Sequence, residues 1–249
     1  MSTHASPIQN AARAQPTLYL AGDSTMALKG ANNGKTDGWG NYVADYVTLP
    51  VVNKAIGGRS ARSYTAEGHF TEILDVVKSG DIVVIEFGHN DGGSPTSTSD
   101  NGRSDCPGSG ATTCKSGKDG STVHTFDYYI TTAAKSYTAK NASVIVSSQT
   151  PNNLWEGGVY SATAPRFLDL AKTAAANAGK GAYFVDHFSA VAAMYKELGN
   201  QATNALYPAD HTHTSPAGAN LSANAFAEAV QKASNPLTPF IKAKIPTVY

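Results

Sequence analysis

The sequence of 249 residues predicts an α/β fold, a three-layer α/β/α arrangement around a flavodoxin-like, five-stranded parallel sheet. Five short apolar segments are continuous rather than alternating in hydrophobicity, which is typical of strands that are covered on both faces. Amphipathic stretches with helical spacing lie between these segments, and such repeated alternation favours parallel strands joined by right-handed crossovers. The expected strands are residues 17–21, 51–55, 82–87, 143–148 and 182–185.

Helical spacing is found in several stretches between and after these strands. The last stretch has the clearest start, because Ser215 can act as an N-cap and Pro216 suits the first position of a helix. A long irregular stretch, residues 92–125, is rich in Gly, Ser, Thr and Asp, and loops of this length in compact domains are usually functional or mobile. We expect helices at residues 39–47, 70–78, 126–139, 165–178, 189–198 and 215–233.

The length and composition indicate one globular domain. We expect this domain over residues 17–249, preceded by a flexible N-terminal extension over residues 1–16. The 19 basic and 19 acidic residues cancel, and without a basic stripe neither nucleic acid nor an anionic membrane is an expected partner. No apolar run approaches the roughly 20 residues that span a bilayer. We therefore expect a soluble protein that acts as a monomer.

Two cysteines, Cys106 and Cys114, lie in the polar loop. No histidine or second cysteine pair accompanies them, so a disulfide is favoured over a zinc site and over two free thiols. Such a bond would stabilise the fold by roughly 2–3 kcal/mol and implies an oxidising compartment. Glycosylation sequons at Asn141 and Asn220 fit the same expectation. Residues 1–15 lack the apolar core of a signal peptide, so we expect a secreted, mature form with a replaced leader rather than an intracellular protein.

Polar segments that can carry chemistry follow three of the expected strands and precede the last helix. The carboxyl ends of parallel strands meet at one edge of a sheet, so the first three segments are expected to converge there. Glycines in the second segment allow a backbone N–H group to approach a ligand closely. The four segments are Gly22-Asp23-Ser24-Thr25, residues 53–60, Gly88-His89-Asn90-Asp91 and Asp210-His211-Thr212-His213.

The first and last segments can supply a nucleophile and its base. The hydroxyl of Ser24 needs a base within hydrogen-bond reach, and His213 can take that role while Asp210 holds its other ring nitrogen. His211 competes with His213 for this assignment. The last segment could instead be a polar turn, or it could supply two ligands of a metal ion. The sequence has no third ligand at a spacing typical of a metal site.

The middle segments can stabilise the negative charge that develops on the carbonyl oxygen during ester cleavage. Donors for this oxyanion are the backbone N–H groups of Ser24 and Gly58 and the side-chain amide of Asn90. Gly57 is adjacent to Gly58 and could replace it, since both are glycines in the same turn. The four segments together therefore predict a serine esterase.

In their order and spacing, the four segments resemble the conserved blocks of the SGNH, or GDSL-type, hydrolases. Within that superfamily they are most similar to rhamnogalacturonan acetylesterases, and the resemblance extends from about residue 17 to residue 233. Any one block is weak, but their number makes the resemblance specific. The stretches that carry it are residues 20–26, 38–40, 58–64, 86–93, 147–153 and 210–218.

The resemblance implies an α/β/α domain that removes acetyl groups from galacturonic acid residues of pectic rhamnogalacturonan, with no metal or organic cofactor. It implies that Ser24 is the nucleophile and selects His213, because the family motif is Asp-x-x-His and begins here at Asp210. It also selects Gly58, which directly precedes the sequence Arg-Ser-Ala-Arg. Fungal members often have a second disulfide near the C-terminus, but residues 235–249 contain no cysteine, so we expect a looser end.

Four residues beside these blocks, Asp23, Thr25, Arg59 and His89, are expected to bind the substrate. Each also has a structural interpretation: Asp23 can orient the turn around the serine, and His89 can form hydrogen bonds across the strand end. Arg59 and Arg62 either form internal salt bridges or meet the carboxylates of an acidic polymer.

Two other functions are compatible with the same residues. One is the same chemistry on another ester, such as acetylxylan, a lipid or a thioester, although the absence of an apolar lid segment argues against long acyl chains. The other is a non-catalytic carbohydrate-binding domain on a hydrolase scaffold, against which the intact catalytic set argues. Trp39 and Trp155 are more consistent with packing than with sugar platforms, Trp155 being the better platform candidate.

Overall fold

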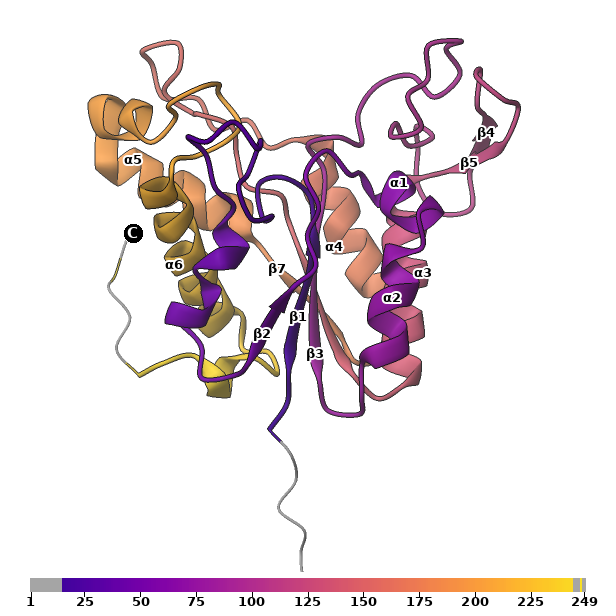
Figure 1. Cartoon of the computed structure of the whole chain (residues 1–249), viewed down its shortest axis with the longest axis horizontal. Coiled ribbons are helices and arrows are strands. Elements are labelled where there is room, and N and C mark those ends of the chain that lie inside the picture. The colour runs from indigo at the N-terminus through magenta and orange to yellow at the C-terminus, as the bar shows by residue number, and fades with distance from the viewer. Residues whose placement is uncertain (1–14, 244–246, 248–249) are drawn as a thin grey trace, which may run out of the picture.

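The structure is a computed structural model that describes residues 15–243 and residue 247. Its centre is a parallel sheet with helices on both faces, so the expected three-layer α/β/α fold is confirmed (Figure 1). The strand order β2-β1-β3-β6-β7 is the flavodoxin-like order. Most of the expected extension over residues 1–16 lies outside the described residues. The strands are β1 (Leu18–Gly22), β2 (Val51–Asn53), β3 (Ile82–Glu86), β6 (Ser143–Ser147) and β7 (Ala182–Val185).

Alternate residues of the central strands face two separate hydrophobic cores. Leu18 and Leu20 of β1 belong to one core, whereas Ala21 belongs to the other. Because both faces are buried, each strand reads as a continuous apolar run, which is the pattern that predicted it. The first core is covered by α5 (His187–Ala205) and α6 (Pro216–Ala233), and the second by α1 (Ala61–Ala66), α2 (His69–Val76), α3 (Phe126–Ala139) and α4 (Arg166–Ala178).

One expected helix is replaced by tighter turns. Residues 39–47 form two short 3₁₀ helices, Trp39–Asn41 and Val43–Asp45, instead of one α-helix. The cause is a close approach of two backbones, since a Cβ atom on Gly40 would lie 2.6 Å from the carbonyl oxygen of Met26. This segment is therefore held by the chain that follows β1 rather than by its own helical periodicity.

Two helices differ from the expected ranges. The short helix α1 was not expected, because its six residues are too few for a periodic pattern. It begins with a capping box in which the side chains of Ser60 and Ser63 each accept a hydrogen bond from the other residue's backbone N–H group. Helix α5 continues beyond the expected residue 198, through a break at Gly199 where φ is 75°.

The stretch at residues 92–125 is held by covalent and ionic links. The expected disulfide joins Cys106 and Cys114, whose Cα atoms are 5.7 Å apart. A buried salt bridge of 2.9 Å between Arg62 and Asp100 ties the loop to α1. The stretch is not wholly irregular, because it contains a two-stranded antiparallel hairpin made of β4 (Thr113–Lys115) and β5 (Thr122–His124).

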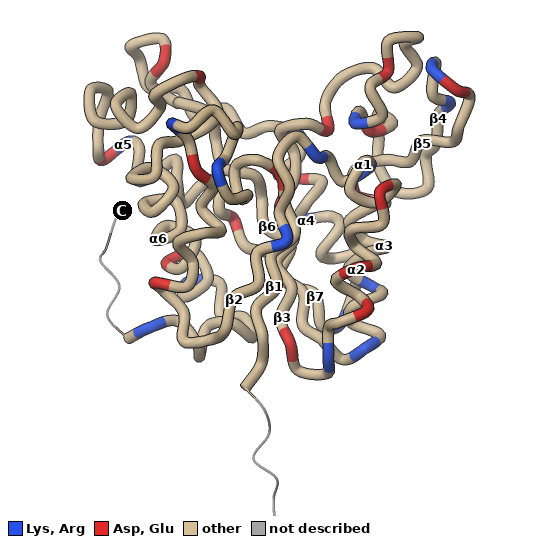
Figure 2. The backbone as a smooth tube through the Cα atoms, viewed as in Figure 1, with Lys and Arg blue, Asp and Glu red and all other residues tan. Residues whose placement is uncertain are grey.

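Basic and acidic residues are interspersed along the backbone of both helical layers (Figure 2). The sequence contains equal numbers of the two charges. In the described part of the chain, no helix combines the length and the apolar character that crossing a membrane requires.

The two sequons differ in their accessibility. Asn141 is exposed in the turn before β6. Asn220 is half-buried in α6, where its side-chain oxygen accepts a hydrogen bond of 2.7 Å from the hydroxyl of Tyr46. Glycosylation of either residue stays a prediction, and the fold favours Asn141.

A buried carboxylate joins three parts of the fold at the carboxyl edge of the sheet. Glu86, the last residue of β3, is 1% exposed. It accepts hydrogen bonds from the Trp39 indole at 2.8 Å and the Ser147 hydroxyl at 2.6 Å, and one of its oxygens lies 2.9 Å from Nδ1 of His187. These three partners come from the first 3₁₀ helix, from β6 and from α5. Removal of the carboxylate would leave the buried indole N–H of Trp39 unpaired and would take a hydrogen-bond partner from Ser147 and His187, which is costly.

We therefore expect Glu86→Ala to lower the free energy of unfolding by about 3–5 kcal/mol, measured by urea denaturation. The matched control is Glu67→Ala, because Glu67 is 39% exposed and pairs with Arg59 at the surface. Such surface pairs contribute less than about 1 kcal/mol. Equal effects of the two substitutions would contradict the central role of Glu86.

Candidate active site

The turn that follows β1 presents Ser24 at the carboxyl edge of the sheet. Gly22 allows the backbone to pass close to β3 here, because it has no side chain. A Cβ atom at this position would come within 2.8 Å of the carbonyl oxygen of Glu86. One carboxylate oxygen of Asp23 accepts hydrogen bonds from the backbone N–H and the hydroxyl of Thr25, at 2.9 and 2.8 Å. These bonds lock the turn around Ser24.

The structure brings Ser24, His213 and Asp210 into one chain of hydrogen bonds. The Oγ atom of Ser24 lies 2.8 Å from Nε2 of His213, and Nδ1 of the same ring lies 2.9 Å from Oδ2 of Asp210. Because a carboxylate only accepts, Nδ1 carries the proton and Nε2 is free to accept from the serine hydroxyl. This is the arrangement that nucleophilic ester cleavage requires.

The carboxyl group of Asp210 is held in its ionised form. Partial burial by itself would raise its pKa, but hydrogen bonds outweigh this effect and the pKa lies below its ordinary value. The donors are the backbone N–H groups of His213 and Thr212, at 2.8 and 2.7 Å, and the His213 ring. A lowered pKa keeps the carboxylate charged at every pH at which an imidazole exchanges its proton.

The expected oxyanion donors line one cleft of about 360 Å³ together with Ser24 and His213. Among the described residues, the backbone N–H groups of Ser24 and Gly58 donate to no other protein group, so both can donate to a ligand. Gly58 has a φ of 74°, a conformation that favours glycine. The amide of Asn90 is oriented by its bond of 3.0 Å to the carbonyl of Arg59. Gly57 lines the same cleft, so the choice of Gly58 stays a prediction.

The residues expected to bind the substrate lie around this cleft rather than along its lining. Asp23 and Thr25 are 1% and 8% exposed and bond to each other beneath the serine. Arg59 pairs with Glu67 at 2.8 Å. His89 is half-buried, with its ring close to the side chains of residues 149 and 150. A role of these four residues in substrate binding stays a prediction.

Two buried carboxyl groups, those of Asp23 and Asp91, lie beside residues that line the cleft. Burial raises the pKa of Asp23, partly opposed by the nearby His89, and burial raises the pKa of Asp91 well above its ordinary value. Asp91 accepts a hydrogen bond of 2.7 Å from the backbone N–H of Ala61, at the start of α1. The third polar segment is thereby tied to the glycine turn that precedes this helix.

The indoles of both tryptophans form hydrogen bonds within the protein, and a role of the half-buried Trp155 as a sugar platform stays untested. Trp39 is 1% exposed and bonds to Glu86, and the indole of Trp155 donates to the carbonyl of Tyr195 at 2.7 Å. No three side chains of His, Cys, Asp or Glu within residues 15–243 are grouped so that they could hold a metal ion.

Four residues of the cleft, Gly30, Ala31, Asn32 and Arg103, were not expected from the sequence, and of these four only Arg103 is charged. Arg103 lies in the 92–125 stretch, and its guanidinium group reaches the cleft beside Gly58 and Asn90. No strand end or periodic pattern marks this position, so only the fold could bring it to the site. The only sequence feature that could have pointed to Arg103 is a positive charge in a loop that contains a disulfide.

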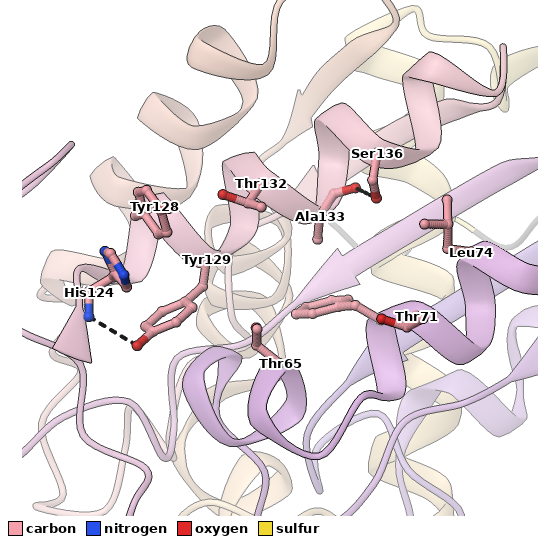
Figure 3. Close-up of a pocket in the computed structure, with 10 residues that line it drawn as sticks. Thr65, Thr71, Leu74, His124, Tyr128, Tyr129, Thr132, Ala133 and Ser136 are labelled. Carbon is pink, nitrogen blue, oxygen red and sulfur yellow. Dashed lines mark hydrogen bonds between the residues drawn. The ribbon is translucent and has the colours of Figure 1, made fainter. Parts of the chain in front are cut away.

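A second hollow, of about 400 Å³, lies between α2 and α3 (Figure 3). Phe70 and Leu74 contribute to its largely apolar wall, and the rings of His124 and Tyr128 stack at its rim with centroids 3.9 Å apart. No residue of the Ser24 hydrogen-bond chain lines this hollow, so the candidate chemistry is confined to the first cleft.

Known proteins are similar to most of the chain. Residues 20–221 match the GDSL-like lipase/acylhydrolase family. A rhamnogalacturonan acetylesterase of Emericella nidulans is 52% identical over 86% of this chain and 84% of that protein. The chain belongs to the GDSL-like lipase/acylhydrolase family. It is a carboxylic ester hydrolase, and its resemblance to rhamnogalacturonan acetylesterases is confirmed.

More distant proteins are similar to this chain in sequence or in fold. A probable rhamnogalacturonan acetylesterase of Bacillus subtilis is 26% identical over 90% of this chain and 96% of its own length. The solved structure of the YxiM protein of Bacillus subtilis has a TM-score of 0.68 at 24% identity; the match covers 88% of this chain but only 56% of that one. A variant of an acetylxylan esterase from Geobacillus stearothermophilus has a TM-score of 0.55 at 18% identity, covering 86% and 94%. At these identities the two structures support the fold alone.

We expect His213→Ala to lower kcat for p-nitrophenyl acetate by at least about 10³-fold, because the base for Ser24 is removed. The matched control is His211→Ala, two residues away, whose exposed ring faces Glu156 at 3.3 Å and does not line the cleft. This control should change kcat by less than about twofold. A larger loss in the control than in His213→Ala would assign the base to His211.

Proposed function

We propose that this hydrolase removes acetyl groups from the backbone of rhamnogalacturonan, a pectic polysaccharide, through an acetyl-enzyme formed on Ser24. The ester chemistry is supported by the hydrogen-bond chain from Ser24 through His213 to Asp210. The choice of polymer is carried by one observation, the 52% identity to a rhamnogalacturonan acetylesterase over most of both chains. An open cleft of about 360 Å³, lined by small residues and polar side chains and by no large apolar side chain, suits a sugar better than a long acyl chain.

Acylation begins when Oγ of Ser24 attacks the carbonyl carbon of the acetyl ester. The hydroxyl proton moves to Nε2 of His213, whose positive charge is stabilised by Asp210. The carbonyl oxygen becomes an oxyanion, which accepts hydrogen bonds from the backbone of Ser24 and Gly58 and from the side chain of Asn90. Each such donor contributes about 10²- to 10³-fold to the rate. The tetrahedral intermediate then expels the sugar oxygen, which takes the proton from His213.

Deacylation repeats these steps with water as the nucleophile. His213 accepts a proton from the water as its oxygen attacks the acetyl carbon. Collapse of the second tetrahedral intermediate breaks the bond to Oγ of Ser24, which regains its proton from His213, and releases acetate. The imidazole must be neutral at the start of both steps, so activity falls at acid pH while Asp210 remains ionised.

We also propose that the protein is secreted and acts as a monomer. The disulfide between Cys106 and Cys114 supports an oxidising compartment. Ser24, His213 and Asp210 all come from one chain, so the site needs no residue of a second subunit.

The direct test compares acetate release from acetylated rhamnogalacturonan, acetylated homogalacturonan and acetylxylan at equal acetyl content. We expect the highest kcat/KM on rhamnogalacturonan, and no release by Ser24→Ala above the uncatalysed background. Faster release from xylan would replace the proposed polymer with a neutral one. Failure of the wild-type protein to release acetate from any of the three would leave the polysaccharide assignment without support.

A further inference from the structure

Arg103 stands out among the arginines of the described residues because it forms no salt bridge. The other three pair with carboxylates at distances of 2.7 to 2.9 Å. Arg103 is half-buried, and its Nη1 atom donates only to neutral oxygens, the carbonyl of Gly58 at 3.3 Å and the amide oxygen of Asn90 at 3.5 Å. Its Nε and Nη2 groups donate to no other group within residues 15–243. Most of the guanidinium fork is therefore available to a ligand.

The backbone on either side of Arg103 is held in place by the chain around it. The backbone N–H groups of Gly102 and Arg103 donate to the side chains of Asp100 and Asn101, both at 3.0 Å. The following carbonyl, that of residue 104, accepts a hydrogen bond of 2.9 Å from a buried arginine of α1. The disulfide at Cys106 begins two residues later. The backbone that carries Arg103 therefore does not need to be ordered when a ligand binds, which lowers the entropic cost of binding.

The surroundings of Arg103 indicate what it binds. It lines the same cleft as Ser24 and His213. A substrate whose ester lies at Ser24 can therefore place a second group of the same molecule against Arg103. A guanidinium fork matches the two oxygens of a carboxylate in geometry and charge. The arginines that the sequence offered for this role, Arg59 and Arg62, are already paired with carboxylates of the protein.

We propose that Arg103 binds the carboxylate of a uronic acid residue at or next to the acetylated sugar, and so selects acidic over neutral acetylated polysaccharides. This inference rests on the proposed ester hydrolysis and adds the group that recognises the acidic polymer. A purely structural role is the competing explanation, since Arg103 also contacts the amide oxygen of Asn90 and could only orient that side chain.

The two explanations differ in which substrates they affect. A residue that only orients Asn90 influences every ester equally, because every ester passes through the same oxyanion. A residue that binds a carboxylate influences only substrates that carry one. The ratio of kcat/KM on an acidic polymer to kcat/KM on a neutral ester therefore separates them.

The experiment measures kcat/KM for Arg103→Gln and Arg103→Lys on three substrates: acetylated rhamnogalacturonan, the same polymer with its carboxyl groups methyl-esterified, and p-nitrophenyl acetate. We expect Arg103→Gln to lower the ratio of acidic to neutral activity by about 10- to 100-fold, the range of a hydrogen-bonded charge pair. Arg103→Lys should restore part of the ratio, because the charge remains without the fork. Added salt should weaken the preference of the wild type for the acidic polymer.

The matched control is Lys118→Gln, which removes one positive charge from an exposed position of the same loop and should leave the ratio within about twofold. Equal losses on all three substrates in Arg103→Gln would overturn the proposal in favour of orientation of Asn90. An unchanged ratio would overturn it as well, while acetate release from rhamnogalacturonan by the wild type would still support the proposed function. A wild type that cleaves p-nitrophenyl acetate but neither polymer would instead overturn the proposed function, and the role of Arg103 with it.

Discussion

The buried carboxylate of Glu86 is the constraint on which the geometry of this fold most depends. It is hydrogen-bonded to residues of the first 3₁₀ helix, of β6 and of α5, and so joins the sheet to the layer formed by α5 and α6. In the parallel register of β1 and β3, Glu86 lies opposite Gly22. The residue that unites the layers is therefore next to the turn that presents Ser24, and the position of the nucleophile follows from the packing of the whole edge.

The site combines local and distant constraints. Locally, Asp23 locks the serine turn through Thr25, and Asp210 holds both the backbone and the ring of His213. Each of these pairs lies within three residues, so the sequence alone specifies it. The bond between Ser24 and His213 spans 189 residues and forms only when the sheet and α6 are packed. Folding is thus what converts two local turns into a nucleophile and its base.

This division explains what the sequence could and could not predict. The strands and the set of Ser24, His213 and Asp210 were predictable, because continuous apolar runs and short polar motifs are local patterns. The two 3₁₀ helices at residues 39–45 were not, since contact with the backbone of Met26 overrides the helical spacing. The pairing of Arg62 with Asp100 and the entry of Arg103 into the cleft depend on the path of the 92–125 stretch. No local pattern encodes that path.

The central claim is that Ser24 carries the acyl group, and covalent labelling tests it most directly. The protein is incubated with an excess of a serine-directed fluorophosphonate, and the modified peptide is identified by mass spectrometry. The account predicts one adduct per chain, on Ser24, formed together with loss of esterase activity, and much slower labelling after His213→Ala. An adduct on another serine that accompanies inactivation, or full inactivation with Ser24 unmodified, would contradict it.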